Sequence, residues 1–336
     1  MSRSVFAFSR RGLATAERVS EALGGASVYA PERLAGGNVL PIPSPSFGFF
    51  AGRFAADGAL IFVGSCGIAV RLIAPHIRSK TEDPAVLVID ELGRHVIPIL
   101  SGHIGGANAL AKLTAQRLGA EAVITTATDI NGRFSVDAWA AENGFSISGM
   151  GLVKEVSAAI LEGEVPVLCD LPVSGELPKG LRTGDGELGI LVSYRKDEPF
   201  TRTLRIVPKC VILGVGCRRG TPCKAIEAAV GEALENAGID PASVKAAASI
   251  DLKSGEAGLL GFCEKHGIPV EFYSAGRLNE VEGDFTRSDF VKGITGVDNV
   301  CERAAMAAGT RLIMRKTVRG GVTVAAALDD TEVRFG

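Results

Sequence analysis

The sequence predicts an α/β protein, in which two mostly parallel α/β domains flank a small α+β middle domain. Apolar, strand-like runs alternate with helical periodicity over the first 130 residues, and this alternation returns after residue 207. Between residues 131 and 207 the alternation is lost, and Pro and Gly gather in loops. A chain of 336 residues is also long for one compact domain. We therefore expect domains at 1–130, 131–207 and 208–336.

In the first region, each apolar run is followed by a helical segment, which favours a parallel sheet with helices on its faces. The runs predicted as strands are 4–9, 26–30, 59–64, 84–90, 95–100 and 121–126. The predicted helices are 13–25, 47–58, 68–77 and a segment that ends at Gly119. The turn 91–94, "ELGR", predicts that the strands on either side form a hairpin or lie next to each other.

The middle region predicts helices at 136–144 and 153–163 and strands at 165–173 and 188–195. In the third region the predicted strands are 211–216, 244–250, 268–273, 310–316 and 321–328. The helices expected between these strands are 221–238, 257–267 and 297–309. Thr221 and Pro222 are the residue types preferred at the N-cap and the first position of a helix.

Composition excludes several classes of protein. The net charge of −2 argues against nucleic acid as a partner, since nucleic-acid binders carry a basic excess. No apolar run reaches the roughly 18 residues that a membrane span needs, and the apolar part of the N-terminus is too short for a signal peptide. The seven cysteines form no CxxC pair, which is typical of reduced thiols in a cytoplasmic protein. The four histidines lack the spacing of metal ligands.

Three segments share one design, in which a strand, a loop of small residues and a helix follow each other: 61–71, 97–110 and 212–226. The first N–H groups of a helix lack partners and carry partial positive charge, so each junction is expected to bind an anion. We expect all three loops at the carboxyl edge of the strands, where α/β sheets bind ligands. The phosphate-binding patterns and the G-x-S-x-G motif are absent, which favours a ligand with several carboxylates.

The motifs in these loops resemble a known family. "GSCGIAVRLIAP" at 64–75, the long block 80–111 that contains "SGHIGGAN", and "VITTATD" at 123–129 resemble the N-terminal region of the cobalt-precorrin-5A hydrolases of anaerobic cobalamin biosynthesis. Three further motifs resemble that family's C-terminal domain: "LGVGCRRGTP", "ASIDLKSGEAGLL" and "DNVCERAAM". The middle region is similar only through "VDAWA", and no fused methyltransferase domain accompanies the match.

The resemblance implies that the substrate is a cobalt-corrinoid macrocycle with many carboxylate arms. In the implied reaction, water opens the ring-A lactone, and the bridging carbon leaves with its methyl group as acetaldehyde. The cobalt travels with the substrate, so no cofactor of the protein's own is expected. Neighbouring enzymes of the pathway are candidate partners.

Lactone hydrolysis needs a base for water and donors for the developing oxyanion. We expect His103 to be the base, Ser101 to orient water or substrate, and the N–H groups of Gly105, Gly106 and Ala107 to face the oxyanion. Cys217 stands beside two arginines, which predicts a lowered pKa for its thiol. The residues expected to bind the substrate are Gly102, Gly105, Gly106, Asn108, Ser65, Arg71, Thr126, Asp129, Cys217, Arg218, Arg219 and Thr221.

Other interpretations stay open at this stage. His103 would also fit as a histidine that only hydrogen-bonds its loop, and Cys217 as a small residue that fills a turn. Lys80, Asp83 and Asp90 fit salt-bridge and capping roles as well as ligand binding. For the whole chain, the alternatives are a non-catalytic carrier of corrinoid intermediates and a phosphate- or nucleotide-using enzyme.

Overall fold

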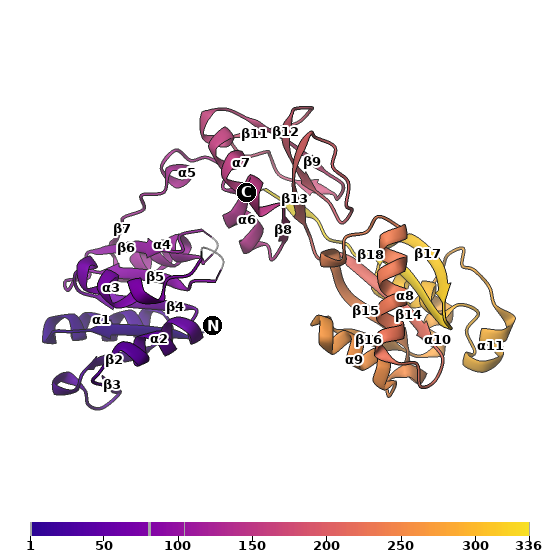
Figure 1. The fold of residues 1–336 in the computed structure, drawn as a ribbon, viewed down its shortest axis with the longest axis horizontal. Coiled ribbons are helices and arrows are strands. Elements are labelled where there is room, and N and C mark those ends of the chain that lie inside the picture. The colour runs from indigo at the N-terminus through magenta and orange to yellow at the C-terminus, as the bar shows by residue number, and fades with distance from the viewer. Residues whose placement is uncertain (1, 80–81, 104, 336) are drawn as a thin grey trace. The chain divides into compact units, whose positions relative to one another are not determined.

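The computed structural model describes residues 2–79, 82–103 and 105–335 (Figure 1). The chain divides into two compact units, Met1–Ala141 and Glu142–Gly336. The predicted α/β class is confirmed, because helices and strands alternate along the chain and most strand pairs of the first sheet are parallel. Among the described residues, no helix combines the length and the apolarity that crossing a lipid bilayer requires.

The first unit is built on a seven-stranded sheet with the order β3-β2-β1-β4-β5-β6-β7. Its strands are β1 (Arg3–Ala7), β2 (Ser27–Pro31), β3 (Val39–Ile42), β4 (Ala59–Val63), β5 (Ala85–Ile89), β6 (His95–Leu100) and β7 (Glu121–Ala122). All neighbouring strands are parallel except β5 and β6, which confirms the predicted hairpin. The chain direction therefore reverses at β6, and β7 follows the reversed direction.

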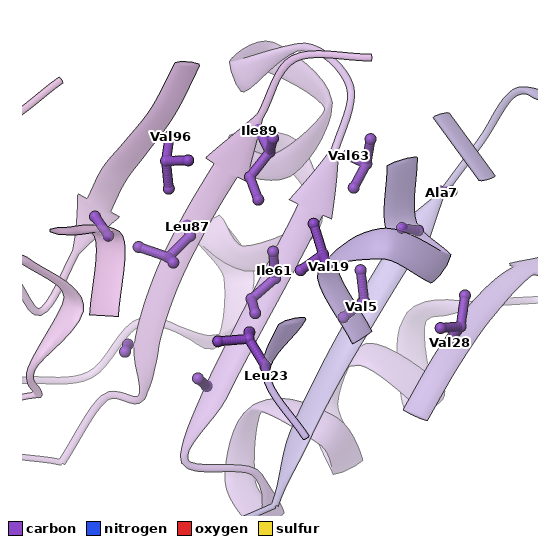
Figure 2. Close-up of a cluster of buried hydrophobic side chains, with 14 of the residues drawn as sticks. Val5, Ala7, Val19, Leu23, Val28, Ile61, Val63, Leu87, Ile89 and Val96 are labelled. Carbon is purple, nitrogen blue, oxygen red and sulfur yellow. The ribbon is translucent and has the colours of Figure 1, made fainter. Parts of the chain in front are cut away.

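Successive side chains of a strand point to opposite faces, and the helices of this unit cover both. The helices are α1 (Arg10–Ala22), α2 (Phe47–Ala56), α3 (Cys66–Ile73), α4 (Ala107–Leu118), α5 (Ala127–Ile130) and α6 (Val136–Glu142), with short 3-10 turns at Glu32–Leu34 and Ala74–His76. Figure 2 shows Val5, Ile61 and Leu87 on the face where Val19 of α1 packs. On the other face, Phe6 and Phe62 pack with Phe50 of α2 in a separate apolar cluster.

Local chemistry explains where the predicted elements differ from the observed ones. Helix α1 starts at Arg10 rather than at residue 13, because the Ser9 hydroxyl accepts a 3.0 Å hydrogen bond from Gly12 N and caps the helix there. Strand β3 was not predicted, and its last two residues belong to the Pro-rich run that starts at Pro41. The strand expected at 121–126 is paired only at Glu121 and Ala122.

The second unit contains two five-stranded sheets and a two-stranded sheet of β10 and β19. The first has the order β11-β9-β12-β13-β8 and is parallel except for β8, while the second has the order β16-β15-β14-β18-β17 and is half parallel. The strands are β8 (Ser146–Ser148), β9 (Val165–Cys169), β10 (Val173–Ser174), β11 (Leu181–Arg182), β12 (Leu188–Val192), β13 (Arg202–Val207), β14 (Val211–Cys217), β15 (Val244–Ile250), β16 (Val270–Tyr273), β17 (Arg311–Arg319), β18 (Val322–Leu328) and β19 (Val333–Arg334). The helices are α7 (Met150–Glu162), α8 (Cys223–Asn236), α9 (Ala257–His266), α10 (Ala275–Glu280), α11 (Asp289–Thr295) and α12 (Val300–Ala308), with 3-10 turns at Pro241–Ser243 and Asp251–Lys253.

A strand pair and an ion pair connect distant segments within the second unit. Strand β19, near the end of the chain, pairs in parallel with β10 of the middle region. Arg205 of β13 forms a 3.1 Å ion pair with Asp240, and both side chains are less than 15% exposed. The structure divides into two compact units, and the three domains expected from the sequence, with boundaries at residues 130 and 207, stay a prediction.

Candidate functional site

Backbone hydrogen bonds link the described residues of the loop between β6 and α4, which are 101–103 and 105–106. Gly106 N donates to His103 O at 2.9 Å, and Ala107 N donates to Ser101 O at 3.0 Å. These two N–H groups are therefore engaged inside the loop. The prediction that Gly106 and Ala107 offer their N–H groups to an oxyanion is wrong for this structure.

Tight backbone packing explains the glycines of this loop. A Cβ at Gly105 would lie 2.3 Å from the Cβ of Ser101, and Gly106 has a φ of 77°, in the left-handed region that favours glycine. Ser101 itself adopts a φ of 57°, which is uncommon for a residue with a side chain. Its hydroxyl donates to Asp83 O at 2.9 Å, so the serine holds the loop against the start of β5.

His103 lies half-buried between two hydroxyl groups. Its Nε2 is 3.3 Å from the hydroxyl of Thr128, and its Nδ1 is 3.2 Å from the hydroxyl of Ser135. The Ser135 hydroxyl in turn donates to the carboxylate of Asp137 at 2.9 Å. The sequence analysis did not predict a site role for Thr128, Ser135 or Asp137, because each is an ordinary polar residue outside the glycine loops.

A second cluster forms around Asn108, which is buried in the first turn of α4. Its side-chain amide donates to the hydroxyl of Thr126 at 2.7 Å and to the carboxylate of Asp129 at 2.9 Å. Its backbone N donates to Gly102 O at 2.9 Å. The structure thus brings together three residues that the sequence singled out, and it adds Lys112, whose ammonium lies 2.6 Å from Asp129.

The charge of Asp129 is stabilised by this cluster. Burial acts to raise the pKa of Asp129, but the hydrogen bond and charge of Lys112, together with the donors Thr126 and Asn108, outweigh it and lower the pKa. Lys112 follows Asn108 by one helical turn, so both project from the same side of α4. That spacing was the signal that would have identified Lys112 in the sequence.

Ser65 and Arg71 lie at the opposite edge of the sheet from His103. Ser65 follows β4, whereas His103 follows β6, which runs in the opposite direction. Leu100, at the end of β6, pairs with Val86 at the start of β5. A five-residue strand spans about 17 Å, so Ser65 and Arg71, both exposed, do not join the cluster around His103. The prediction that all three loops share the carboxyl edge is therefore wrong.

Two acidic residues of the long matched block serve the local fold. The carboxylate of Asp83 accepts hydrogen bonds from Arg78 N at 3.0 and 3.2 Å. Asp90 accepts from the backbone N of Leu92 and Arg94, each at 2.9 Å, and so stabilises the hairpin turn before β6. The capping role considered for Asp83 and Asp90 is therefore confirmed. Lys80 lies outside the described residues.

The third glycine loop joins β14 to α8 in the second unit, and its N-cap prediction is wrong. Pro222 occupies the N-cap of α8, and the Thr221 hydroxyl donates to Arg218 O at 2.8 Å, within the turn itself. Gly220 N donates to the carboxylate of Glu256 at 2.6 Å. This backbone N–H group therefore already binds an anionic group of the protein itself.

The thiol of Cys217 does not have the lowered pKa that its neighbours suggested. Burial raises the pKa of Cys217 and the charge of Glu256 acts in the same direction, while Lys253 and the hydroxyl of Thr221 only partly oppose them. The prediction failed because the two adjacent arginines extend into solvent, where their charge is screened. Cys217 is thus better suited to packing than to nucleophilic chemistry.

Arg218 and Arg219 are the exposed cations of this loop. The aliphatic part of Arg218 packs beside Gly321 in the turn between β17 and β18, where a Cβ would lie 3.2 Å from Arg218 Cδ. Within the described part of the chain, neither guanidinium has an ion-pair partner within 4.0 Å. Two such cations next to a helix start can bind carboxylates of a ligand.

Three family models match the chain in order. They are described as cobalamin synthesis G N-terminal, over residues 48–129, cobalamin biosynthesis central region, over 134–208, and cobalamin synthesis G C-terminus, over 211–327. All the site residues named above fall within these three matches.

Among curated proteins, the cobalt-precorrin-5A hydrolase of Salmonella typhimurium is 34% identical over 337 aligned residues, which cover 96% of each chain. The cobalt-precorrin-5A hydrolase of Priestia megaterium is 35% identical and covers 82% of this chain and 79% of its own. A protein named CobE from Sinorhizobium is 33% identical over 121 residues, which are 35% of this chain and 79% of the relative.

Proposed function

This chain belongs to the cobalt-precorrin-5A hydrolase family, and we infer from that membership that it hydrolyses cobalt-precorrin-5A to cobalt-precorrin-5B in cobalamin biosynthesis. The observation that carries this conclusion is the 34% identity that extends over 96% of both this chain and a curated relative of that activity. The family-model matches over residues 48–129 and 211–327 include all three glycine loops.

For the chemistry, we propose that His103 takes a proton from the water that attacks the ring-A lactone. Addition of water breaks the acyl C–O bond and leaves a carboxylate and a free hydroxyl on the bridging carbon. That hydroxyl then loses its proton and becomes the carbonyl oxygen of acetaldehyde as the C–C bond to the macrocycle breaks. The electron pair of that bond passes into the macrocycle, whose cobalt arrives as part of the substrate.

The loop around His103 supports its proposed role as the base. His103 lies in a loop whose backbone is fixed by its own hydrogen bonds, so the imidazole is held in place before substrate arrives. For the second unit by itself, we propose that the exposed Arg218 and Arg219 bind carboxylates of the corrinoid. We propose that Ser101 acts through the loop conformation, since its hydroxyl proton is already donated to Asp83 O.

The setting of the reaction is part of the proposal. Seven free cysteines in the described chain fit a reducing compartment, and we place the enzyme in the cytoplasm. Its substrate is a cobalt-corrinoid, which the preceding enzymes of the pathway supply.

The test is to incubate the purified protein with cobalt-precorrin-5A and to follow acetaldehyde with a coupled dehydrogenase and the macrocycle by mass. We expect one acetaldehyde per turnover without added nucleotide or metal. His103→Ala should lower kcat by about 10²–10⁴-fold, whereas His95→Ala, at the opposite edge of the same sheet, should not change it. Binding of the corrinoid by folded protein without acetaldehyde release would favour the carrier alternative instead.

A further inference from the structure

The hydrogen-bond partners of His103 define which of its nitrogens carries a proton. We propose that Ser135 and Asp137 are positioning residues that hold neutral His103 as the Nδ1–H tautomer, so that Nε2 is the atom available to accept a proton. This inference rests on the proposed function only for its catalytic consequence, because the tautomer is a property of the protein alone.

The argument starts from a count of hydrogens. A serine hydroxyl has one proton to donate, and that of Ser135 is directed to the carboxylate of Asp137 at 2.9 Å. A carboxylate accepts hydrogen bonds, so the direction of this bond is fixed. The oxygen of Ser135 can therefore only accept from His103 Nδ1, 3.2 Å away, and Nδ1 must carry the hydrogen.

The other side of the ring agrees with this assignment. With the hydrogen on Nδ1, Nε2 has a free electron pair and can accept from the Thr128 hydroxyl at 3.3 Å. That contact is longer than a typical O–H hydrogen bond, so a water molecule beside a bound lactone would replace it at little cost. Thr128 is itself 7% exposed, which makes it unsuitable for direct attack on a bulky macrocycle.

The two positioning residues are held rigidly. Phe134, Val136 and Trp139 are buried on the same short segment, and the rings of Phe134 and Trp139 lie 5.5 Å apart. Asp137 lies in the first turn of α6, where the helix dipole favours a negative charge, and its Oδ1 also accepts from Ala138 N at 3.0 Å. The segment therefore presents Ser135 and Asp137 in a fixed orientation toward His103.

This arrangement also gives a role to the segment 131–141, which follows the N-terminal sheet. Ser135 and Asp137 fall within the match to the central-region family model, yet they belong to the first compact unit together with His103. The start of the central region thus supplies the groups that orient the histidine of the N-terminal loop.

The tautomer can be measured directly on the full chain labelled with ¹⁵N-histidine, by two-bond ¹H–¹⁵N correlation spectra above neutral pH. Four histidines give a simple spectrum, and His103→Gln assigns the signal of interest. We expect a protonated Nδ1 and an unprotonated Nε2 in the parent. Ser135→Ala and Asp137→Ala should shift the proton to Nε2, the tautomer that a free histidine side chain prefers, whereas Thr128→Val should leave it on Nδ1. Ser135→Thr, which keeps the hydroxyl, should restore the parent signal.

The catalytic consequence is tested separately, with folding checked by Trp139 fluorescence. Ser135→Ala should lower kcat about 10–100-fold with little change in KM, since Ser135 is proposed to act through His103. A parent spectrum with the proton on Nε2, or a tautomer unchanged in Ser135→Ala, would overturn the proposal. A changed tautomer with unchanged kcat would overturn the positioning role, and an inactive parent with the expected spectrum would count against the proposed function alone.

Discussion

Replacing Asn108 by Ala should destabilise the first compact unit without affecting the second. The side-chain amide of Asn108 is buried and donates to the hydroxyl of Thr126 and to the charged carboxylate of Asp129. Both acceptors lie on the segment that follows β7, so the amide ties that segment to the first turn of α4. Alanine removes both bonds and leaves the carboxylate of Asp129 with fewer donors.

The size of the effect follows from these two bonds. The bond to the Thr126 hydroxyl contributes about 0.5–1.5 kcal/mol and the bond to the ionised Asp129 about 1.5–3 kcal/mol. The higher helix propensity of alanine returns roughly 0.5 kcal/mol. The free energy of unfolding of the first unit should therefore fall by about 1.5–4 kcal/mol, which moves its urea midpoint down by about 0.75–2 M at an m-value near 2 kcal/mol/M.

The chain contains a single Trp, and Trp139 is buried within the first unit, so its fluorescence reports the unfolding of that unit alone. Asn131→Ala is the matched control, because Asn131 is exposed and donates one bond, to Ala127 O at 2.8 Å. We expect its effect to stay within about 0.5 kcal/mol. If Asn108→Ala were no more destabilising than this control, the cluster around Asn108 would not hold the segment in place.

Three further outcomes follow from the site. The double variant Arg218→Ala, Arg219→Ala should bind the corrinoid at least about 100-fold more weakly, because each lost arginine–carboxylate bond costs about 1.5–3 kcal/mol. Absorbance titration of the folded protein measures this affinity. An unchanged affinity would mean that both arginines are structural. Because the pKa of Asp129 is lowered in the folded state, its contribution to stability is present above the unfolded value near 3.8 and is lost as the pH falls through the folded value. The unfolding free energy reported by Trp139 should accordingly fall more steeply below pH 4 in the parent than in Asp129→Asn, and equal slopes would contradict the lowered pKa. Since partial burial raises the pKa of Cys217, its alkylation in native protein should be slow near neutral pH and should accelerate as the pH rises, as followed by peptide mass. Rapid labelling at neutral pH would contradict a thiol that is protonated there.

Much of the fold was predictable because hydrophobic periodicity determines it. The strands around Ile61 and Leu87 are apolar throughout, as expected for strands covered on both faces, and the hairpin was indicated by its short turn. The cap of α8 was not predictable from residue preference, because the Thr221 hydroxyl bonds within its own turn and leaves the N-cap to Pro222. The partners Thr128 and Ser135 carry no motif, and only the tertiary structure places them beside His103.

The misplacement of Ser65 and Arg71 has a different cause, because the information was already in the sequence. Only four residues separate the predicted strands 84–90 and 95–100, and a connection that short can join only antiparallel strands. The reversal sends the end of β6, and with it the 101–106 loop, to the edge where β5 begins. Applying that rule would have separated the first glycine loop from the second.

The same reversal explains why the groups around His103 come together at all. Strand β7 is parallel to β6 and pairs with its first two residues, His95 and Val96, so the chain leaves β7 running toward the edge of the sheet where the His103 loop lies. The residues that follow β7 within a short distance can then reach that loop, and these include Thr126, Asp129 and Ser135. Had β6 continued in the direction of β5, its loop would lie beside Ser65 at the opposite edge. The hairpin turn at Asp90 therefore decides which polar side chains surround the histidine, and the proposed base depends on the topology of the sheet as much as on its own loop.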